Sequence, residues 1–485
     1  MKLRNFTLLF ALTLRRASAF AGASSDRQGE RGGIFSLVLS LSKDKRKIAL
    51  ATAGSLSCLM QMLPSYAMEI RASTRVKIPL VLVVDTANND MNIIAARVQT
   101  AFTFSGQFTV SLQSLPAALN KKTVQALHAQ GYPLALIMTH LDAQQIEWRL
   151  YDTLQARMIV GKKCRAQSGD LNWWALHIAS SVWPELTGQE GFFLTKIAYS
   201  KQVKGKKGRV LRHICVADFD GLHEQVVVNT PTINIMPRWN HDTQNPLLFY
   251  SEYTNDNVRM MMVDTHKRRK IASDFEGINM LTSFSADGKK VVYCASRGDG
   301  NCQIYYHAPG VFKRLLYTHK ATGKSLSDGN NISPSLSADG NVVYFCSDFL
   351  TQLPQIFAYD MGTGTVTKLT EGGYCASPAY CHKTQQLAYT KKIDGIMQLY
   401  VCNTKTGVHQ QLTTDEYSKD ECSWSPCGNY LLVSLEKDSM SRIAVYNMLT
   451  KQLQDITGKS TVCGYPAWSP AYTNYTLIDE GSVAA

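Results

Sequence analysis

The second half of the chain carries six positions whose side chains are spaced for hydrogen bonding to a common partner. Each position lies five residues before a large residue that recurs along the chain, and three of the six are asparagine. An asparagine amide both donates and accepts hydrogen bonds, so a group of them can bind the backbone of another protein. Asparagine also caps turns locally, and this alternative stays open. The six positions are Asn234, Asn279, Asn331, Cys375, Lys419 and Cys463.

Catalytic and metal-binding motifs are absent from the sequence. It contains no Gly-x-Ser-x-Gly elbow, P-loop, dinucleotide fingerprint or zincin motif. The twelve cysteines include no Cys-x-x-Cys pair, and the eleven histidines lack zinc-site spacing. Cys294, Cys346 and Cys402 lie in apolar strand patterns, where cysteine behaves as a small buried hydrophobic residue. We therefore predict no catalytic residue, no metal-binding residue and no cofactor.

The recurring large residues mark a structural repeat. They are Trp239, Phe284, Leu336, Tyr380, Trp424 and Trp468, separated by intervals of 45, 52, 44, 44 and 44 residues. The long interval contains a polar insertion at residues 318–330. A repeat of about 40–45 residues with four short strands is typical of β-propeller blades. The sequence predicts an all-β six-bladed β-propeller, with the three repeat tryptophans in the core between blades.

The two ends of the repeat region indicate how the propeller closes. Residues 196–228 supply three strands without an inner strand, whereas residues 465–469 form an inner strand without the other three. Pairing these segments completes a blade from both chain ends and leaves no open sheet edge.

Inner strands line the central channel of a propeller, so the six equivalent positions are predicted to surround one mouth of that channel. Apolar neighbours of the asparagines complete the mixture of apolar anchors and hydrogen bonds found in protein-binding hot spots. None of the six positions is acidic, which argues against a glycosidase or lyase site. The predicted partner-binding residues are Asn234, Asn279, Met280, Leu281, Asn331, Ile332, Ser333 and Lys419.

A different architecture precedes the repeat. Residues 78–84 form an apolar, β-branched run that is typical of a buried strand. Apolar residues recur at helical spacing in later segments, and alternating strand patterns lie between them. This mixture predicts a small α/β domain of about 120 residues. The predicted helices are near 90–104, 123–129 and 170–186, and the further strands near 107–112, 134–138 and 146–151.

Residues 1–67 are interpreted as an N-terminal extension with a secretory signal peptide. Three basic residues at 45–47 precede an apolar stretch at 48–62, and Ser65-Tyr66-Ala67 has the small-x-small pattern of a signal peptidase site. A signal that starts at Met1 and a membrane anchor that stays attached are the alternatives.

The positive charge is concentrated in that segment. Residues 1–67 hold ten of the 51 Lys and Arg and three of the 38 Asp and Glu, which is +7 of the net charge of +13. The remaining +6 is spread over the rest of the chain, without the focused positive charge of a nucleic-acid-binding domain.

Segments at the domain boundaries resemble the TolB family. Residues 186–199 are similar to the family's linker into the first blade, residues 216–221 to the hairpin of that blade, and residues 465–470 to its closing strand. The resemblance covers nearly everything after the predicted signal. Apart from the N-terminal extension and the polar insertion, the departures are altered turn motifs at 240–243 and 381–384.

The resemblance implies a non-enzymatic, periplasmic protein-binding component of the Tol–Pal envelope system. The propeller mouth would bind the peptidoglycan-associated lipoprotein Pal, and the freed N-terminus of the mature chain would bind TolA. Such a protein supports outer-membrane integrity and constriction during cell division, and it associates with the envelope only through its partners. A propeller enzyme of the glycosidase or lyase type and another periplasmic scaffold propeller are the alternatives.

The predicted boundaries follow from these segments. They are 1–67 for the extension and signal, 68–188 for the α/β domain, 189–195 for the linker, 196–475 for the propeller and 476–485 for a tail.

Overall fold

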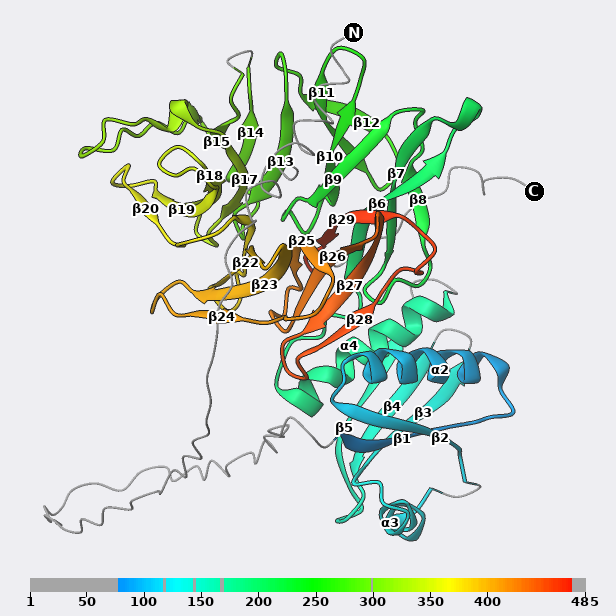
Figure 1. Cartoon of the computed structure of the whole chain (residues 1–485). Helices are drawn as coiled ribbons and strands as arrows, with labels where there is room; N and C mark the ends of the chain where they lie inside the picture. The colour runs from blue at the N-terminus through cyan, green and yellow to red at the C-terminus, as the bar shows by residue number, and fades with distance from the viewer. Residues whose placement is uncertain (1–76, 117–118, 143–144, 166–169, 298–299, 473–485) are drawn as a thin grey trace, which may run out of the picture. The chain divides into compact units, whose positions relative to one another are not determined.

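The computed structural model describes residues 77–116, 119–142, 145–165, 170–297 and 300–472 (Figure 1). The predicted signal peptide, the predicted mature N-terminus and the predicted tail lie outside the described residues. In the described ranges, no helix is long and apolar enough to cross a membrane.

The first part of the described chain is an α/β domain built on a five-stranded sheet of order β2-β1-β3-β4-β5. Strand β1 is parallel to β2 and β3, whereas β3, β4 and β5 are antiparallel neighbours. Its elements are β1 (Ile78–Val84), α2 (Asn89–Phe104), β2 (Phe108–Ser114), α3 (Lys121–Ala129), β3 (Leu134–Asp142), β4 (Gln145–Asp152), β5 (Arg157–Arg165) and α4 (Leu171–Thr187).

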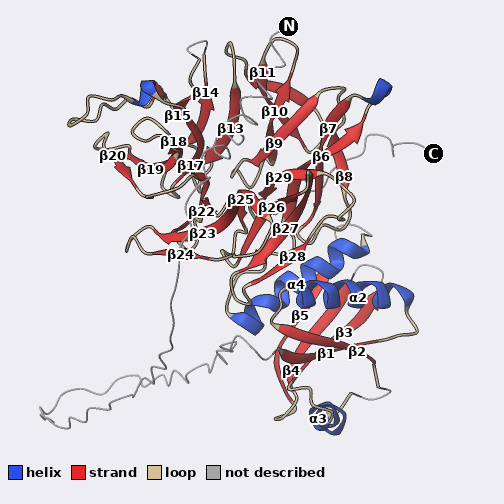
Figure 2. Cartoon of the chain, in the orientation of Figure 1, coloured by secondary structure: helices blue, strands red, loops and turns tan. Residues whose placement is uncertain are grey.

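Both faces of this sheet are covered. Alternate residues of β1 pack with α2 and α4 on one face and contribute to a smaller cluster with α3 on the other face (Figure 2). The long helices begin at side-chain caps, Asn88 for α2 and Asp170 for α4, and α4 ends at Gly188 in the left-handed conformation. The sequence correctly predicted these helices and four of the strands. It missed β5, because nearly all side chains of β5 are exposed and no apolar alternation marks it.

The rest of the described chain is a β-propeller of antiparallel strands (Figure 1). Four sheets of four strands each follow one another along the chain, and each begins with the strand nearest the channel. They are β13 (Asn279–Phe284), β14 (Val291–Ala295), β15 (Gln303–Ala308) and β16 (Val311–Arg314); β17 (Asn331–Leu336), β18 (Val342–Ser347), β19 (Gln355–Asp360) and β20 (Val366–Lys368); β21 (Cys375–Tyr380), β22 (Gln386–Ile393), β23 (Ile396–Asn403) and β24 (His409–Gln411); and β25 (Ser418–Trp424), β26 (Tyr430–Lys437), β27 (Met440–Asn447) and β28 (Gln452–Asp455).

The remaining strands form one sheet of eight rather than two separate blades, so the prediction of six separate blades is not met in that form. The sheet has the order β12-β11-β10-β9-β7-β6-β29, with β8 paired to β7. Its two halves are joined by a single parallel residue pair, Arg212 with Ile233. Its strands are β6 (Lys196–Lys204), β7 (Val210–Asp218), β8 (Gln225–Val228), β9 (Ile233–Trp239), β10 (Leu247–Tyr253), β11 (Val258–Asp264), β12 (Arg269–Ser273) and β29 (Cys463–Trp468).

The predicted closure by the two chain ends is confirmed. Strand β29 pairs antiparallel with β6, from Cys463 opposite Lys201 to Trp468 opposite Ile197. The inner strands β9, β13, β17, β21, β25 and β29 contact one another in chain order, and β29 contacts β9. The six inner strands therefore form a closed ring.

The eleven cysteines in the described residues are all free thiols, and ten of them are buried. The insertion at 318–330 is held by a bridge between Thr318 and Ser325 and a short 3-10 turn, η2 (Leu326–Asp328), whose Leu326 is buried.

The described residues of the α/β domain and of the propeller belong to one compact unit and share a buried aromatic core. Phe104 of α2 packs edge-on against Phe219, with ring centres 5.0 Å apart. The ring centres of Phe192 and Tyr430 are 4.8 Å apart. Arg97 of α2 crosses the same interface to Asp218 and Asp220. The two parts are therefore joined by both apolar packing and buried ion pairs.

Candidate functional site

Each inner strand bends at the same place. The third residue before each recurring large residue is a non-glycine residue in the left-handed region, and the pairing with the second strand shifts register there. A β-bulge of this kind re-aims side chains, and a non-glycine residue in the left-handed region is uncommon within a strand. The six residues, with φ between 52° and 57°, are Met236, Leu281, Ser333, Ser377, Glu421 and Tyr465.

Neighbouring inner strands are cross-linked just beyond the bulges. The hydroxyl of Ser283 accepts from the backbone N–H of Leu336 at 3.0 Å, and Ser335 and Ser423 do the same for the next strands at 2.8 Å. Each bond satisfies a backbone donor that the bulged ladder leaves unpaired.

Alanine replaces this serine in two blades, and a tryptophan supplies the link instead. The indole of Trp424 donates to the carbonyl of Ala379 at 2.9 Å, and the indole of Trp239 donates to that of Ala467 at 3.2 Å. Trp468 donates to Thr195 at 2.8 Å. All three indoles are at most 9% exposed, so the prediction that they form inter-blade core is confirmed.

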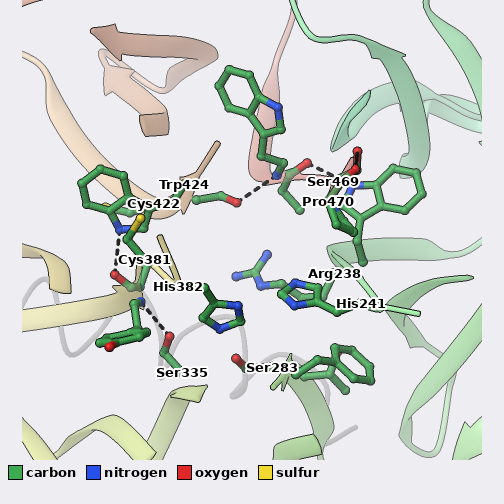
Figure 3. Close-up of a pocket in the computed structure, with 18 of the residues that line it drawn as sticks. Arg238, His241, Ser283, Ser335, Cys381, His382, Cys422, Trp424, Ser469 and Pro470 are labelled. Carbon is green, nitrogen blue, oxygen red and sulfur yellow. Dashed lines mark hydrogen bonds between the residues drawn. The ribbon is translucent and has the colours of Figure 1, made fainter. Parts of the chain in front are cut away.

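These strands enclose a cavity of about 280 Å³ that receives residues from all six of them (Figure 3). Arg238 of β9 donates to Glu421 of β25 at 2.6 Å, which ties two non-adjacent inner strands together across the cavity. The side chains of His241 and His382 approach one another beside Arg238, with ring centres 5.0 Å apart and planes at 79° (Figure 3). The cavity thus combines one ion pair, two imidazoles and apolar or hydroxyl groups.

Burial controls the charge of these groups. Burial and the neighbouring His382 lower the pKa of His241 to about 3, and burial also lowers the pKa of His382. Both imidazoles are therefore neutral at pH 7. Burial raises the pKa of Glu421, which Arg238 counteracts. The ion pair is the main charged feature among these four side chains.

The predicted asparagine ring is not accessible in this structure. Asn234, Asn279 and Asn331 are at most 1% exposed. Each amide donates to carbonyls of the segment before its own strand or of a neighbouring strand, at 2.9 Å to Arg212 for Asn234 and 2.6 Å to Phe275 for Asn279. The expectation that these amides face a partner is therefore corrected. Their hydrogen bonds are those of the alternative, in which each asparagine caps a turn within the protein.

Asn331 and Lys419, at the same position of their repeats, also make buried hydrogen bonds within the protein. Asn331 donates to the Leu326 carbonyl at 2.8 Å and to the side-chain oxygen of Gln303 at 2.9 Å. Lys419 is fully buried, and its ammonium donates to Gln398 at 3.1 Å and to the Tyr417 carbonyl at 2.7 Å. A carboxylate at position 331 cannot make these donations, so substitution there costs stability as well as any binding.

Two of the eight predicted partner-binding residues line the cavity, namely Leu281 and Ser333. Met280 belongs to the propeller core, and Ile332 packs against that core. The structure therefore brings Leu281 and Ser333, the two bulge residues of the predicted set, together at the cavity wall. Their neighbours Met280 and Ile332 pack in or against the propeller core.

The prediction missed the ion pair and both histidines of the cavity, although the sequence held a signal for the histidines. His241 and His382 both lie two residues after the recurring large residue, at 239 and 380. The sequence interpretation treated these segments as altered turns, because serine and aspartate are replaced there. Aligning the repeats by column would have shown the same residue type at the same offset twice. Arg238 and Glu421 occur once each and carry no such signal.

No cluster of three or more His, Cys, Asp or Glu suited to a metal ion occurs in the described ranges.

The chain is similar to known proteins over most of the described length. Residues 183–472 match the family described as "TolB beta propeller domain". A protein of Gluconobacter oxydans (strain 621H) named "Tol-Pal system protein TolB" is 26% identical over 376 residues, which are 76% of this chain and 80% of that protein. A protein of the same name from Francisella tularensis subsp. holarctica (strain OSU18) is 32% identical over 298 residues, which are 51% of this chain and 68% of that protein.

The fold has a solved counterpart. The match to the crystal structure of TolB from Acinetobacter baumannii covers 82% of this chain and 98% of the Acinetobacter chain, with a TM-score of 0.69 at 22% identity. This similarity concerns the arrangement of the α/β domain and the propeller.

Proposed function

Because this chain belongs to the family of the TolB β-propeller domain and acts in the Tol–Pal system, we propose that it is a non-enzymatic periplasmic protein that links the lipoprotein Pal to TolA. Pal would bind at the propeller channel, and the freed N-terminus of the mature chain would bind TolA. In this role the protein contributes to outer-membrane integrity and to constriction during division.

The channel supports this proposal better than any other feature. The inner-strand ring presents a cavity whose wall combines aromatic, apolar and hydroxyl groups with the paired Arg238, and aromatic residues and arginine are enriched at the centres of protein interfaces. The only carboxylate among the four side chains described there, Glu421, is held by Arg238. A glycosidase or lyase needs two carboxyl groups with separate roles, so the enzyme alternative is not favoured.

Six blades are proposed as the repeat number of the ring. The eight-stranded sheet divides at the single pair Arg212–Ile233 into two groups of four strands. Each of the six inner strands carries the same bulge, including β9 and β29. We also retain 68–188, 189–195 and 196–475 as the α/β domain, linker and propeller, and residues 1–67 as the removed segment.

The partner-binding set is proposed in two roles. Leu281 and Ser333, which line the cavity, contact the partner directly. Met280 and Ile332 fix the bulges from the core side, and the capping groups of Asn234, Asn279, Asn331 and Lys419 hold the segments before the strands in place.

Affinity capture from envelope extract tests the proposed partners. The purified protein, immobilised through its C-terminus, is expected to retain Pal and TolA, identified by mass spectrometry. A matched column that carries the same protein after heat denaturation controls for nonspecific binding. Capture of neither partner, under conditions in which the protein melts cooperatively, would contradict the proposal.

A further inference from the structure

Two histidines meet in the channel from opposite sides of the inner-strand ring. His241 follows β9 and His382 follows β21, so two inner strands separate them along the ring in one direction and two in the other. Their ring centres are 5.0 Å apart at an interplanar angle of 79°. Figure 3 shows both rings at the centre of the cavity.

We propose that His241 and His382 together bind a divalent transition-metal ion, of which zinc is the representative, and thereby join opposite sides of the channel. This inference is independent of the proposed Pal and TolA binding. Water molecules complete the coordination, because in the described part of the chain no third His, Cys, Asp or Glu is grouped with them as a metal ligand.

The separation of the rings fits a shared ion. Zinc lies about 2.0–2.1 Å from an imidazole nitrogen, which places it about 3.2 Å from the ring centre, so two tetrahedral imidazole ligands have ring centres about 5.2 Å apart. The observed separation of 5.0 Å differs little from this value. An ion can therefore enter with small side-chain adjustments and without moving the strands.

The hydrogen bond of His382 leaves a lone pair available on that ring. His382 Nε2 lies 3.2 Å from the carbonyl oxygen of Leu336. A carbonyl only accepts, so Nε2 carries the proton and Nδ1 carries the free lone pair. Burial lowers the pKa of His241, and the backbone of Ser285 acts to raise it, which is the effect of a hydrogen bond from the ring to a carbonyl. Metal-binding histidines typically donate their other N–H to a carbonyl or carboxylate, which fixes the tautomer.

The local charge also permits a cation. Arg238 lines the same cavity, but its ion pair with Glu421 at 2.6 Å neutralises it. The exposed Lys383 pairs with Glu190 at 3.7 Å. No uncompensated positive charge among these residues opposes the ion.

Calorimetric titration with zinc chloride tests the site, using protein without a polyhistidine tag. The wild type is expected to bind one ion per chain. His241→Ala and His382→Ala should each weaken binding by more than the roughly 10–100-fold that changes outside the ligand shell cause. His307→Ala, which removes an exposed histidine of β15, is the matched control and should bind like the wild type.

A thermal-melt series makes the result independent of folding defects. Zinc should raise the melting temperature of the wild type and of His307→Ala, because an ion that binds only the folded state stabilises it. Zinc should not change the melting temperatures of His241→Ala, His382→Ala or the more conservative His382→Gln. The proposal is overturned if the wild type shows no saturable binding, or if cooperatively melting single variants bind zinc as tightly as the wild type.

Discussion

A protein that lacks residues 463–485 should lose the cooperative unfolding transition of the propeller and aggregate. The deletion removes β29, which is the inner strand of the sheet built from β6, β7 and β8. Trp468 alone is 5% exposed and bonded to Thr195, and loss of such a buried tryptophan costs about 3–5 kcal/mol. Whole domains are stable by about 5–15 kcal/mol, so the loss of the complete strand leaves little or no stability.

The deletion also creates an open sheet edge. Strand β6 loses the strand that pairs with it, and β25 and β9 lose a packed neighbour in the ring. Unpaired sheet edges favour association between chains. Circular dichroism melts and light scattering measure both effects. Removal of 476–485 alone, which spares β29, is the control and should melt like the full chain. A 463–485 deletion that melts at the full-length temperature would rule out closure by the two chain ends.

Arg97→Ala should lower the free energy of unfolding by about 3–5 kcal/mol, because it removes the ion-pair partner of the buried carboxylate of Asp220 and, beside Lys196, one of the basic partners of the buried Asp218. Arg97 is 8% exposed and donates to Asp218 at 3.1 Å, to Asn172 at 2.8 Å and to Asp220. The same guanidinium lies over the ring of Phe219, 5.4 Å from its centre. Urea denaturation measures the loss. Arg149→Ala, which breaks the more exposed pair with Glu147, is the matched control and should cost at most about 1 kcal/mol.

The pH dependence of the same interface has a defined sign. Burial opposes ionisation of Asp218, but Lys196, Asn172 and His223 outweigh burial, so its pKa lies below the usual value. Its stabilising contribution is therefore complete above the unfolded pKa of about 3.9 and is lost as the pH falls through the lower folded pKa. In Arg97→Ala this carboxylate loses a cation, so acid unfolding should begin at a higher pH than in the wild type. An identical acid transition in both proteins would show that the Arg97 pairs do not stabilise the interface.

The sequence predicted elements wherever the apolar pattern was strong. The run of β1 and the helical spacing of α2 and α4 identified these elements within two residues of their observed bounds. The closure by β29 was also predictable, because a repeat that begins with three strands and ends with one has a single way to complete its sheet. Strand β5 has no such pattern, because it lies at a sheet edge with its side chains in solvent.

The site was less predictable for a geometric reason. A fixed offset along the repeat correctly grouped Asn234, Asn279 and Asn331, but it did not reveal which way their side chains point. The bulge after each of them turns the backbone, so Leu281 and Ser333 face the cavity while the asparagines are buried behind it. The six left-handed residues that create the bulges are of five residue types, so no shared residue type marks them in the sequence.

The most direct test of channel binding is a calorimetric titration of Pal, without its lipid, into Ser333→Arg and the wild type. Ser333 is half-buried at the cavity wall, and an arginine there would fill the space with a charged side chain. Thr367→Arg, on the exposed outermost strand β20 of the same sheet, is the matched control. The wild type and Thr367→Arg are expected to bind Pal equally, and Ser333→Arg at least about tenfold more weakly, a difference of about 1.4 kcal/mol, with similar melting temperatures in all three. Equal affinity of Ser333→Arg and the wild type would contradict binding at the channel.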